Sequence, residues 1–212
     1  MEETKVYLQE ECKKRFASAR AAVKELIQRN VGASWNERLI DEPKPLVIGI
    51  DGMCASGKTT LGNYLQQEFG GNLFHMDDFF LQDHQRTKER LIEIGGNVDY
   101  ERFREEVLDR IISKSTVFYR PFHCAVRKIQ EGREVPYQPL NIIEGSYSLH
   151  PYFGESYDLK IFLHRDKEKQ IETIRIRNGE AMLQRFVTEW IPKENAYFEA
   201  FQIRQDCIQI HW

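Results

Sequence analysis

The chain has 212 residues, of which 41% are hydrophobic and 30% are charged, and its formal net charge is −3. This composition fits one globular domain with a modest appendage and argues against a disordered chain or a nucleic-acid-binding surface. We see no secretory signal and no run of 18 apolar residues, and the four cysteines are scattered, so disulfides and a zinc site are not expected. We therefore expect a cytoplasmic protein without a nucleic-acid or membrane partner, and leave a homo-oligomer open.

The first quarter of the chain carries a helical pattern. Apolar residues recur in steps of three and four between Lys5 and Asn30, which predicts an amphipathic helix. The basic run Lys13–Arg15 lies within this pattern, and we interpret it as a solvated helix face. The segment Asp41–Pro45 contains two prolines and is expected to break regular structure. We divide the chain into an N-terminal helical extension, 1–44, and a main domain, 45–212.

In the main domain, strands alternate with helices. The expected strands are Leu46–Ile50, Asn72–Met76, Thr116–Tyr119, Leu140–Ile143, Leu159–Leu163 and Cys207–Ile210. The expected helices are Lys58–Phe69, His84–Ile94, Tyr100–Ser113 and Asp166–Asn178, with further helical segments up to Phe201. A protruding hairpin is expected over Ala125–Pro136, around Glu131-Gly132. This alternation predicts an α/β fold with a parallel sheet covered by helices on both faces.

The segment Gly52–Thr59 satisfies the pattern G-x-x-x-x-G-K-[ST] in full. Its glycines let the backbone turn tightly and bring N–H groups close to phosphate oxygens, and the helix that follows aims its N-terminus at the same anion. Lys58 adds an ammonium group for the outer phosphates, and the Thr59 hydroxyl can hold Mg²⁺. An apolar strand precedes the loop and a helical pattern follows it, so we predict a binding site for nucleotide phosphates.

Acidic residues follow two of the predicted strands. Asp77 and Asp78 come after the second strand, so one of them could accept a proton from a hydroxyl group, although a polar turn would also explain them. Glu144 ends a later strand and could orient Mg²⁺ directly or through water. The chain contains neither N-K-x-D nor D-x-x-G, which GTPases normally carry, so these acids favour a small-molecule kinase.

Arginines accompany the helix that follows the next strand. Arg165, Arg175 and Arg177 could close over the phosphates and neutralise charge during transfer. Residues two apart do not share one helix face, so one of Arg175 and Arg177 could simply be solvated. We expect a lid near 165–180.

Together these segments resemble the uridine kinase family of P-loop kinases, in the group that includes phosphoribulokinase and bacterial pantothenate kinase. The resemblance runs from about Leu46 to the C-terminus. It rests on the segments Ile48–Thr60, His75–Phe79, Asn97–Asp99, Ile142–Gly145 and Leu159–Leu163 with its following helix. It implies a P-loop NTPase three-layer fold, ATP and Mg²⁺ as cofactors, and phosphoryl transfer to a hydroxyl group of a small-molecule acceptor.

The resemblance also implies a role for individual residues. Asp77 would be the catalytic base, acting with Lys58, Arg175 and Arg177. Thr59 and Glu144 would hold the metal. Asp99 would bind the sugar hydroxyls of an acceptor nucleoside, Tyr119 would line the base pocket, and His123 would fit the base-reading position with a shifted alignment. The hairpin would cover this pocket. The nucleotide itself would contact Gly52, Ala55, Ser56, Gly57, Lys58, Thr59 and Thr60.

The sequence departs from the family pattern around the acceptor. Phe80 stands where the family has a tyrosine, Val98 where it has an aromatic residue, and Arg120 where it has an aspartate. Phosphoryl transfer therefore carries over better than uridine does, and a nucleoside is the first guess. The alternatives are a kinase for a non-nucleoside alcohol, such as pantothenate or a sugar derivative, and a regulator that senses ATP without turning it over. The retained Asp77 and Glu144 argue against the regulator.

Overall fold

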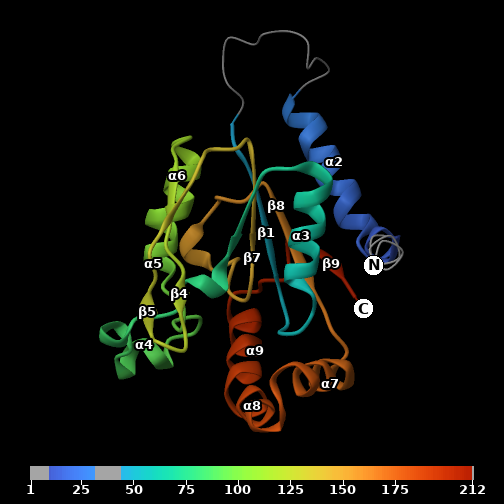
Figure 1. The fold of residues 1–212 in the computed structure, drawn as a ribbon. Coiled ribbons are helices and arrows are strands. Elements are labelled where there is room, and N and C mark those ends of the chain that lie inside the picture. The colour runs from blue at the N-terminus through green and yellow to red at the C-terminus, as the bar shows by residue number, and fades with distance from the viewer. Residues whose placement is uncertain (1–9, 32–43, 212) are drawn as a thin grey trace.

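The computed structural model describes residues 10–31 and 44–211. These residues form a five-stranded sheet in which every pair of neighbours is parallel (Figure 1). From one edge to the other, the strands are β2 (Asn72–His75), β7 (Leu140–Glu144), β1 (Leu46–Gly52), β8 (Leu159–Leu163) and β9 (Ile208–Ile210). Because the strands are parallel, the loops after β1, β2 and β7 all leave the sheet at the carboxyl ends of the strands. The predicted P-loop, Asp77 and Glu144 lie at these ends.

Helices connect the strands, and α3 and α7 agree with the expected ranges. The described helices are α2 (Ala17–Val31), α3 (Lys58–Phe69), α4 (Lys88–Ile92), α5 (Tyr100–Phe103), α6 (Asp109–Ile112), α7 (Lys167–Asn178), α8 (Glu180–Arg185) and α9 (Ile191–Ala200). A π-helical segment, Arg104–Leu108, joins α5 to α6, and another, Phe186–Trp190, joins α8 to α9. No helix in the described ranges is long and apolar enough to cross a membrane.

The predicted helix over His84–Ile94 is shorter than expected. A 3₁₀ turn at Asp83–Gln85 precedes α4, which begins only at Lys88. The reason is a capping interaction, because the Thr87 hydroxyl accepts a hydrogen bond from the Arg90 N–H at 3.2 Å. Thr87 therefore ends the preceding turn and starts a separate short helix.

The sheet is buried on both faces. Successive residues of β1 alternate between two hydrophobic clusters, with Val47 on one face and Ile48 and Ile50 on the other. The first cluster includes residues of the helical segment 100–112 and of the hairpin, and the second includes residues of α3 and of the N-terminal helix. Figure 1 shows these helices on opposite sides of the sheet. The predicted three-layer α/β fold is confirmed.

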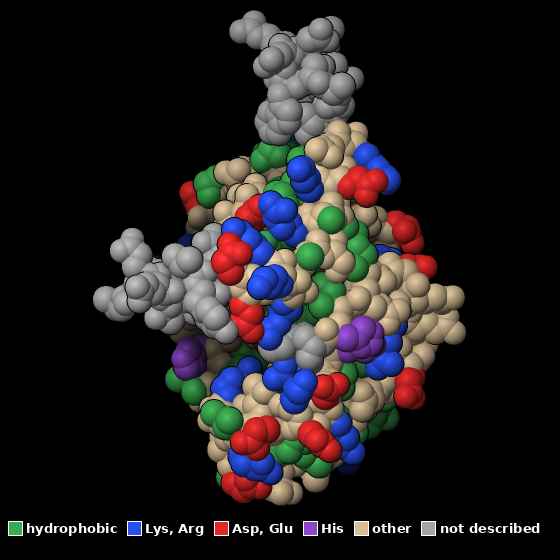
Figure 2. Space-filling view, turned by 90° about the vertical axis from the view of Figure 1, so that its right-hand side faces the viewer, with side chains coloured by type: hydrophobic (Ala, Val, Ile, Leu, Met, Phe, Trp, Pro, Cys, Tyr) green, Lys and Arg blue, Asp and Glu red, His purple; other side chains and the backbone are tan. Residues whose placement is uncertain are grey.

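The N-terminal helix packs onto the second face. Residues 10–15 are helical, a turn lies at Phe16, and α2 continues the helix. Phe16, Ala19 and Val23 are fully buried in the cluster that contains Ile48 and Ile50. The outer face carries mixed basic and acidic side chains (Figure 2), including the pairs Lys13–Glu10 and Arg15–Glu11.

Parts of the N-terminal predictions lie outside the described residues. These are the first residues of the expected helix, 5–9, and residues 41–43 of the expected linker. The division of the chain at 44/45 stays a prediction.

The predicted hairpin exists, but its turn was placed wrongly. β3 (Val117–Tyr119) pairs with β6 (Arg133–Val135), and β4 (Phe122–His123) pairs with β5 (Lys128–Ile129), so the turn lies at residues 124–127. A glycine is needed at position 132 for a reason other than a turn. A Cβ at this position would lie 2.7 Å from side-chain atoms of Phe118 and Arg120. Close packing between the strands, rather than a reversal of the chain, explains this glycine.

Candidate functional site

The loop between β1 and α3 has the backbone geometry that its sequence pattern predicts. Gly57 precedes α3 with φ 89°, and Gly52 has φ 142°. A Cβ on Gly52 would lie 2.3 Å from the carbonyl oxygen of Leu163, in the neighbouring strand β8, so only glycine fits there. Ala55 also has a positive φ, 57°. The chain therefore turns tightly and delivers the first N–H groups of α3 to the end of the loop.

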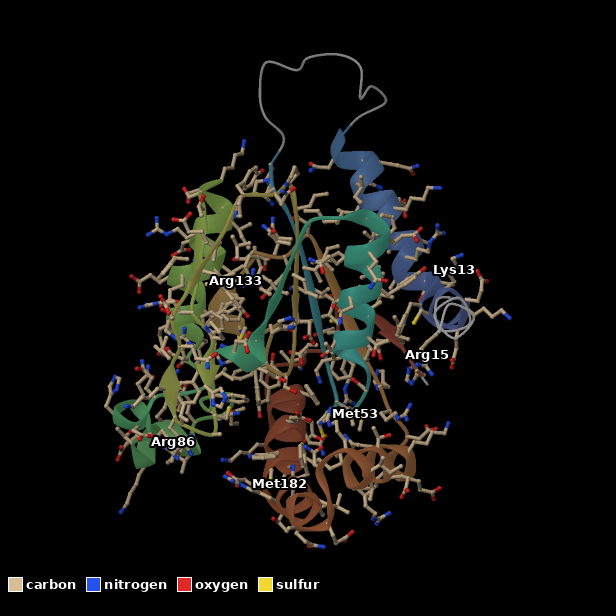
Figure 3. All side chains as sticks on the ribbon, in the orientation of Figure 1. Lys13, Arg15, Met53, Arg86, Arg133 and Met182 are labelled. Atoms are coloured by element: carbon tan, nitrogen blue, oxygen red, sulfur yellow. The ribbon has the colours of Figure 1, made fainter. Side chains whose placement is uncertain are left out.

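Lys58 lies over this loop. Its ammonium group donates hydrogen bonds to the carbonyl oxygens of Gly52, at 2.8 Å, and Met53, at 3.0 Å. The side chain is only 8% exposed, and Ser56, two residues before it, is fully buried. Figure 3 labels Met53 in this loop and Met182 on α8, below it. The residues predicted to bind phosphate therefore lie close together in this loop.

The two predicted metal ligands are in contact. The Thr59 hydroxyl lies 3.1 and 3.3 Å from the two carboxylate oxygens of Glu144. Glu144 is 4% exposed, and its Oε1 lies 2.5 Å from Nδ1 of His75, the residue opposite it in β2. This contact raises the pKa of His75 above its ordinary value. The sequence reasoning missed His75, although a polar residue beside Asp77 at a strand end was a usable signal.

These residues fit a magnesium ion bound together with a nucleotide. The described part of the chain contains no group of three or more histidine, cysteine or acidic side chains that could hold a metal alone. Mg²⁺ in phosphotransferases needs only one or two protein ligands, because phosphate oxygens and water complete its shell. Thr59 and Glu144 supply such a pair beside the loop between β1 and α3, residues 52–57, which we name the phosphate loop.

Asp77 and Asp78 lie in the 3₁₀ turn that follows β2. The Asp78 carboxylate accepts a 2.6 Å hydrogen bond from the Tyr119 hydroxyl. Asp77 keeps solvent access, yet the surrounding protein raises its pKa to about 6, mainly by desolvation. The Lys58 ammonium opposes this shift, and the charges of Glu144, Glu194 and Asp78 add to it. Of these two acids, Asp77 is therefore the one that lies near Lys58 and Glu144, and its pKa is raised.

The three residues expected to bind a nucleoside are in different environments. Asp99 is 2% exposed, accepts a hydrogen bond from the Arg102 N–H as the cap of α5, and forms an ion pair with the Arg102 guanidinium at 3.4 Å. Tyr119 is 3% exposed and packs between Phe74 and Phe79. His123 is exposed on the hairpin. The structure thus does not gather the three on one open surface.

The two arginines predicted for a lid are exposed in the last turn of α7. Arg175 pairs with Glu172 and Glu180, at 2.5 and 3.1 Å, and the Arg177 Nε donates to the Asn178 side chain at 2.9 Å. The structure does not bring either into contact with the loop. The buried face of α7 is formed by Gln170 and Ile174. Arg177 follows these by seven and three residues and so shares their side of the helix, whereas Arg175 does not.

Three buried polar residues at the loop also escaped the sequence analysis. Asp51 is fully buried, where it accepts hydrogen bonds from the N–H groups of Gly52 and Leu149 and from the Tyr197 hydroxyl, and burial raises its pKa to about 6. Gln170 and Glu194 contact Cys54 from α7 and α9. Their partners are far away in the sequence, so no local pattern points to them.

A parallel sheet whose central strand ends in a glycine-rich loop and a helix N-terminus, with an acid at the end of the adjacent strand, defines a P-loop NTPase-like α/β protein. The solved structures that it matches include several kinases. A possible uridine kinase from Bacillus stearothermophilus superposes with a TM-score of 0.66 at 20% identity, covering 94% of this chain and 99% of that one.

A D-glycerate 3-kinase from Cryptococcus neoformans var. grubii superposes with a TM-score of 0.61 at 16% identity, covering 85% of this chain and 89% of that one. No family model and no curated protein sequence matches the chain. Identities this low establish the shared fold and leave the reaction to be argued from the site.

Proposed function

We propose that this protein is a kinase that transfers the γ-phosphoryl group of ATP, with Mg²⁺, to a hydroxyl group of a small metabolite. The contact between Thr59 and Glu144 beside the phosphate loop carries this proposal, because these two side chains would supply the protein ligands of a magnesium ion bound with the nucleotide. The placement of Asp77 near Lys58 and Glu144 adds an acid–base group to the same site. Binding alone would not require such a group.

The chain's own groups divide the work of the transfer. The N–H groups at the start of α3 and the Lys58 ammonium bind the phosphates. Thr59 and Glu144 would hold Mg²⁺, which would supply positive charge to the phosphate oxygens. Asp77 accepts the proton of the acceptor hydroxyl. Its pKa of about 6 leaves it ionised at neutral pH and makes it a stronger base than an ordinary aspartate. Arg177 reaches the phosphates only after a movement of the lid.

For the acceptor, we propose a molecule smaller than a nucleoside. The resemblance assigned the sugar hydroxyls to Asp99 and the base to Tyr119, yet both side chains are almost fully buried and paired within the protein. A hydroxy acid needs neither contact, and a sugar derivative does not need the contact with a base. One of the structures with the same fold is a kinase of D-glycerate, which is an acceptor of this size.

The proposal is tested by an ATP-consumption assay with a panel of nucleosides, hydroxy acids, sugars and vitamins. We expect turnover with an alcohol smaller than a nucleoside. We expect Asp77→Asn to lose at least about 100-fold in kcat, within the range usual for a general base, while its Kd for Mg·ATP stays close to that of the wild type.

Two results would contradict the proposal. Full kcat in Asp77→Asn would remove the assigned base. Tight Mg·ATP binding without turnover of any acceptor would instead favour the nucleotide-sensing regulator.

A further inference from the structure

The peptide units on both sides of Cys54, the third residue of the phosphate loop, are held by buried side chains from two later helices. The Cys54 N–H donates to Oε2 of Glu194, on α9, at 2.9 Å. The Cys54 carbonyl oxygen accepts from Nε2 of Gln170, on α7, at 3.0 Å. Glu194 is 6% exposed and Gln170 is 2% exposed. Neither residue contacts the nucleotide or the acceptor in the mechanism proposed above, and Glu194 acts there only through its charge, which raises the pKa of Asp77.

The N–H groups of the loop fall into two sets. Those of Gly52, Met53 and Cys54 donate to the Asp51 carboxylate at 2.7 Å, to the Leu163 carbonyl at 3.1 Å and to Glu194, respectively. The first N–H groups of α3, from Lys58 onward, have no acceptor within the helix because it begins there. The first half of the loop is thus bonded to the protein. In the second half the Ser56 N–H donates to the Met53 carbonyl at 3.1 Å, so the N–H groups open to an anion are those at the start of α3.

Glu194 is itself anchored. Its other carboxylate oxygen accepts a 2.7 Å hydrogen bond from the Ser146 hydroxyl, two residues after Glu144. On the side of Gln170, the Cys54 side chain packs with Ile174, Leu183 and Phe186, which lie between the start of α7 and the start of α9. Cys54, Gln170 and Glu194 therefore join the loop after β7 and the segment α7–α9 to the phosphate loop.

We propose that Glu194 and Gln170 are positioning residues of the phosphate loop. By binding the Cys54 N–H and C=O, they hold the first half of the loop so that the N–H groups from Gly57 onward point at the nucleotide phosphates. They act through the backbone and do not touch the substrate. This inference rests on the proposed function, because it assumes that the loop binds a nucleotide.

The test compares Glu194→Gln with Glu194→Ala. The amide oxygen of Glu194→Gln can still accept from the Cys54 N–H, and its amide nitrogen can donate to the Ser146 hydroxyl. We expect its Kd for Mg·ATP, measured by calorimetry, to stay within about twofold of the wild type. In Glu194→Ala both hydrogen bonds are lost, and we expect Kd to rise about 10-fold, or about 1.4 kcal/mol. Glu199→Ala, at an exposed position of the same helix, is the matched control and should change nothing.

A second readout needs no nucleotide. Amide hydrogen exchange, followed by NMR, should show a protected Cys54 N–H in the wild type and in Glu194→Gln. The same N–H should exchange at least about 10-fold faster in Glu194→Ala, because its acceptor is gone. If Glu194→Ala does not fold, Gln170→Ala replaces it, with the same expected rise in Kd, since it releases the other side of Cys54.

The outcomes separate this inference from the proposed function. Equal weakening in Glu194→Gln and Glu194→Ala would show that the charge matters rather than the acceptor, and would overturn the inference. Tighter ATP binding in Glu194→Ala would also overturn it, since the carboxylate would then oppose the phosphates. A wild-type protein that binds no Mg·ATP would refute the proposed function itself, whereas normal binding in every variant would refute only the positioning role.

Discussion

Asp77 and Asp78 are adjacent in the sequence, but the structure gives them different chemistry. The Tyr119 hydroxyl donates to Asp78, and this hydroxyl also lies 3.3 Å from the His75 carbonyl oxygen, so Asp78 is part of the structure of the turn. Asp77 instead faces the charges of Lys58, Glu144 and Glu194. Two identical side chains therefore differ in environment, because one has a hydrogen-bond partner and the other lies among charged groups.

At this scale we predict the pH dependence of turnover. Asp77 must be ionised to accept a proton, so kcat should fall as the pH drops through about 6, the raised pKa of this group. The negative charge of Glu194 contributes to that elevation, so Glu194→Gln should move the acidic limb of the kcat profile to lower pH. Profiles measured between pH 4.5 and 8.5 check both points, a range chosen to span about 6.

Glu199→Gln, an exposed residue on the same helix, is the control and should leave the acidic limb in place. A limb that does not move in Glu194→Gln would mean that a group other than Asp77 controls the rate, or that Glu194 does not act on it.

At the scale of elements, α7 presents its two arginines differently. Its buried stripe, Gln170 and Ile174, lies against Cys54 of the phosphate loop, and Arg177 extends the same stripe by one turn. Arg175 lies off this stripe and pairs with Glu172 and Glu180. Closure of the lid would bring Arg177 toward the phosphates more directly than Arg175.

We therefore predict that Arg177→Ala lowers kcat by about 100-fold, as the removal of a cation that stabilises the transition state does. Arg175→Ala should change kcat by less than about threefold, because its ion pairs are exposed and contribute little. Steady-state kinetics with the acceptor found in the panel measure both. The reverse order of effects would assign the lid role to Arg175, and equal small effects would remove it from α7.

On the scale of the whole molecule, the N-terminal helix shares a core with the sheet. Phe16 is fully buried and its ring lies 6.0 Å from that of Tyr64, on α3. The helix thus covers one face of the sheet. The sequence alone predicted residues 1–44 as an extension of the main domain.

We predict that Phe16→Ala lowers the free energy of unfolding by about 3 to 5 kcal/mol, because it empties a buried aromatic position. Urea denaturation measures the change, with Lys24→Ala at an exposed position of the same helix as the control. The Kd for Mg·ATP at low temperature should remain unchanged, since Phe16 does not belong to the site. Equal stability of both variants would make the helix a separate appendage.

The sequence by itself determined the order of strands and helices, the phosphate loop and the candidate acids at the strand ends. These features are local, since alternating apolar runs, a glycine pattern and a residue at the end of a strand depend on neighbours in the chain. The boundaries of β8 were predicted exactly as observed, over Leu159–Leu163. The contact between Thr59 and Glu144 could be predicted only in part from the sequence, because it also requires β1 and β7 to be adjacent.

Tertiary structure alone decided the rest. The hairpin turn lies at residues 124–127 because pairing of β3 with β6 sets the register, and a glycine between packed strands looks like a turn in the sequence. Asp99 and Tyr119 are buried because partners distant in the chain surround them. Glu194 and Gln170 reach Cys54 only when α7 and α9 pack on the loop. Such contacts depend on the folded path of the whole chain, and no short segment of sequence encodes them.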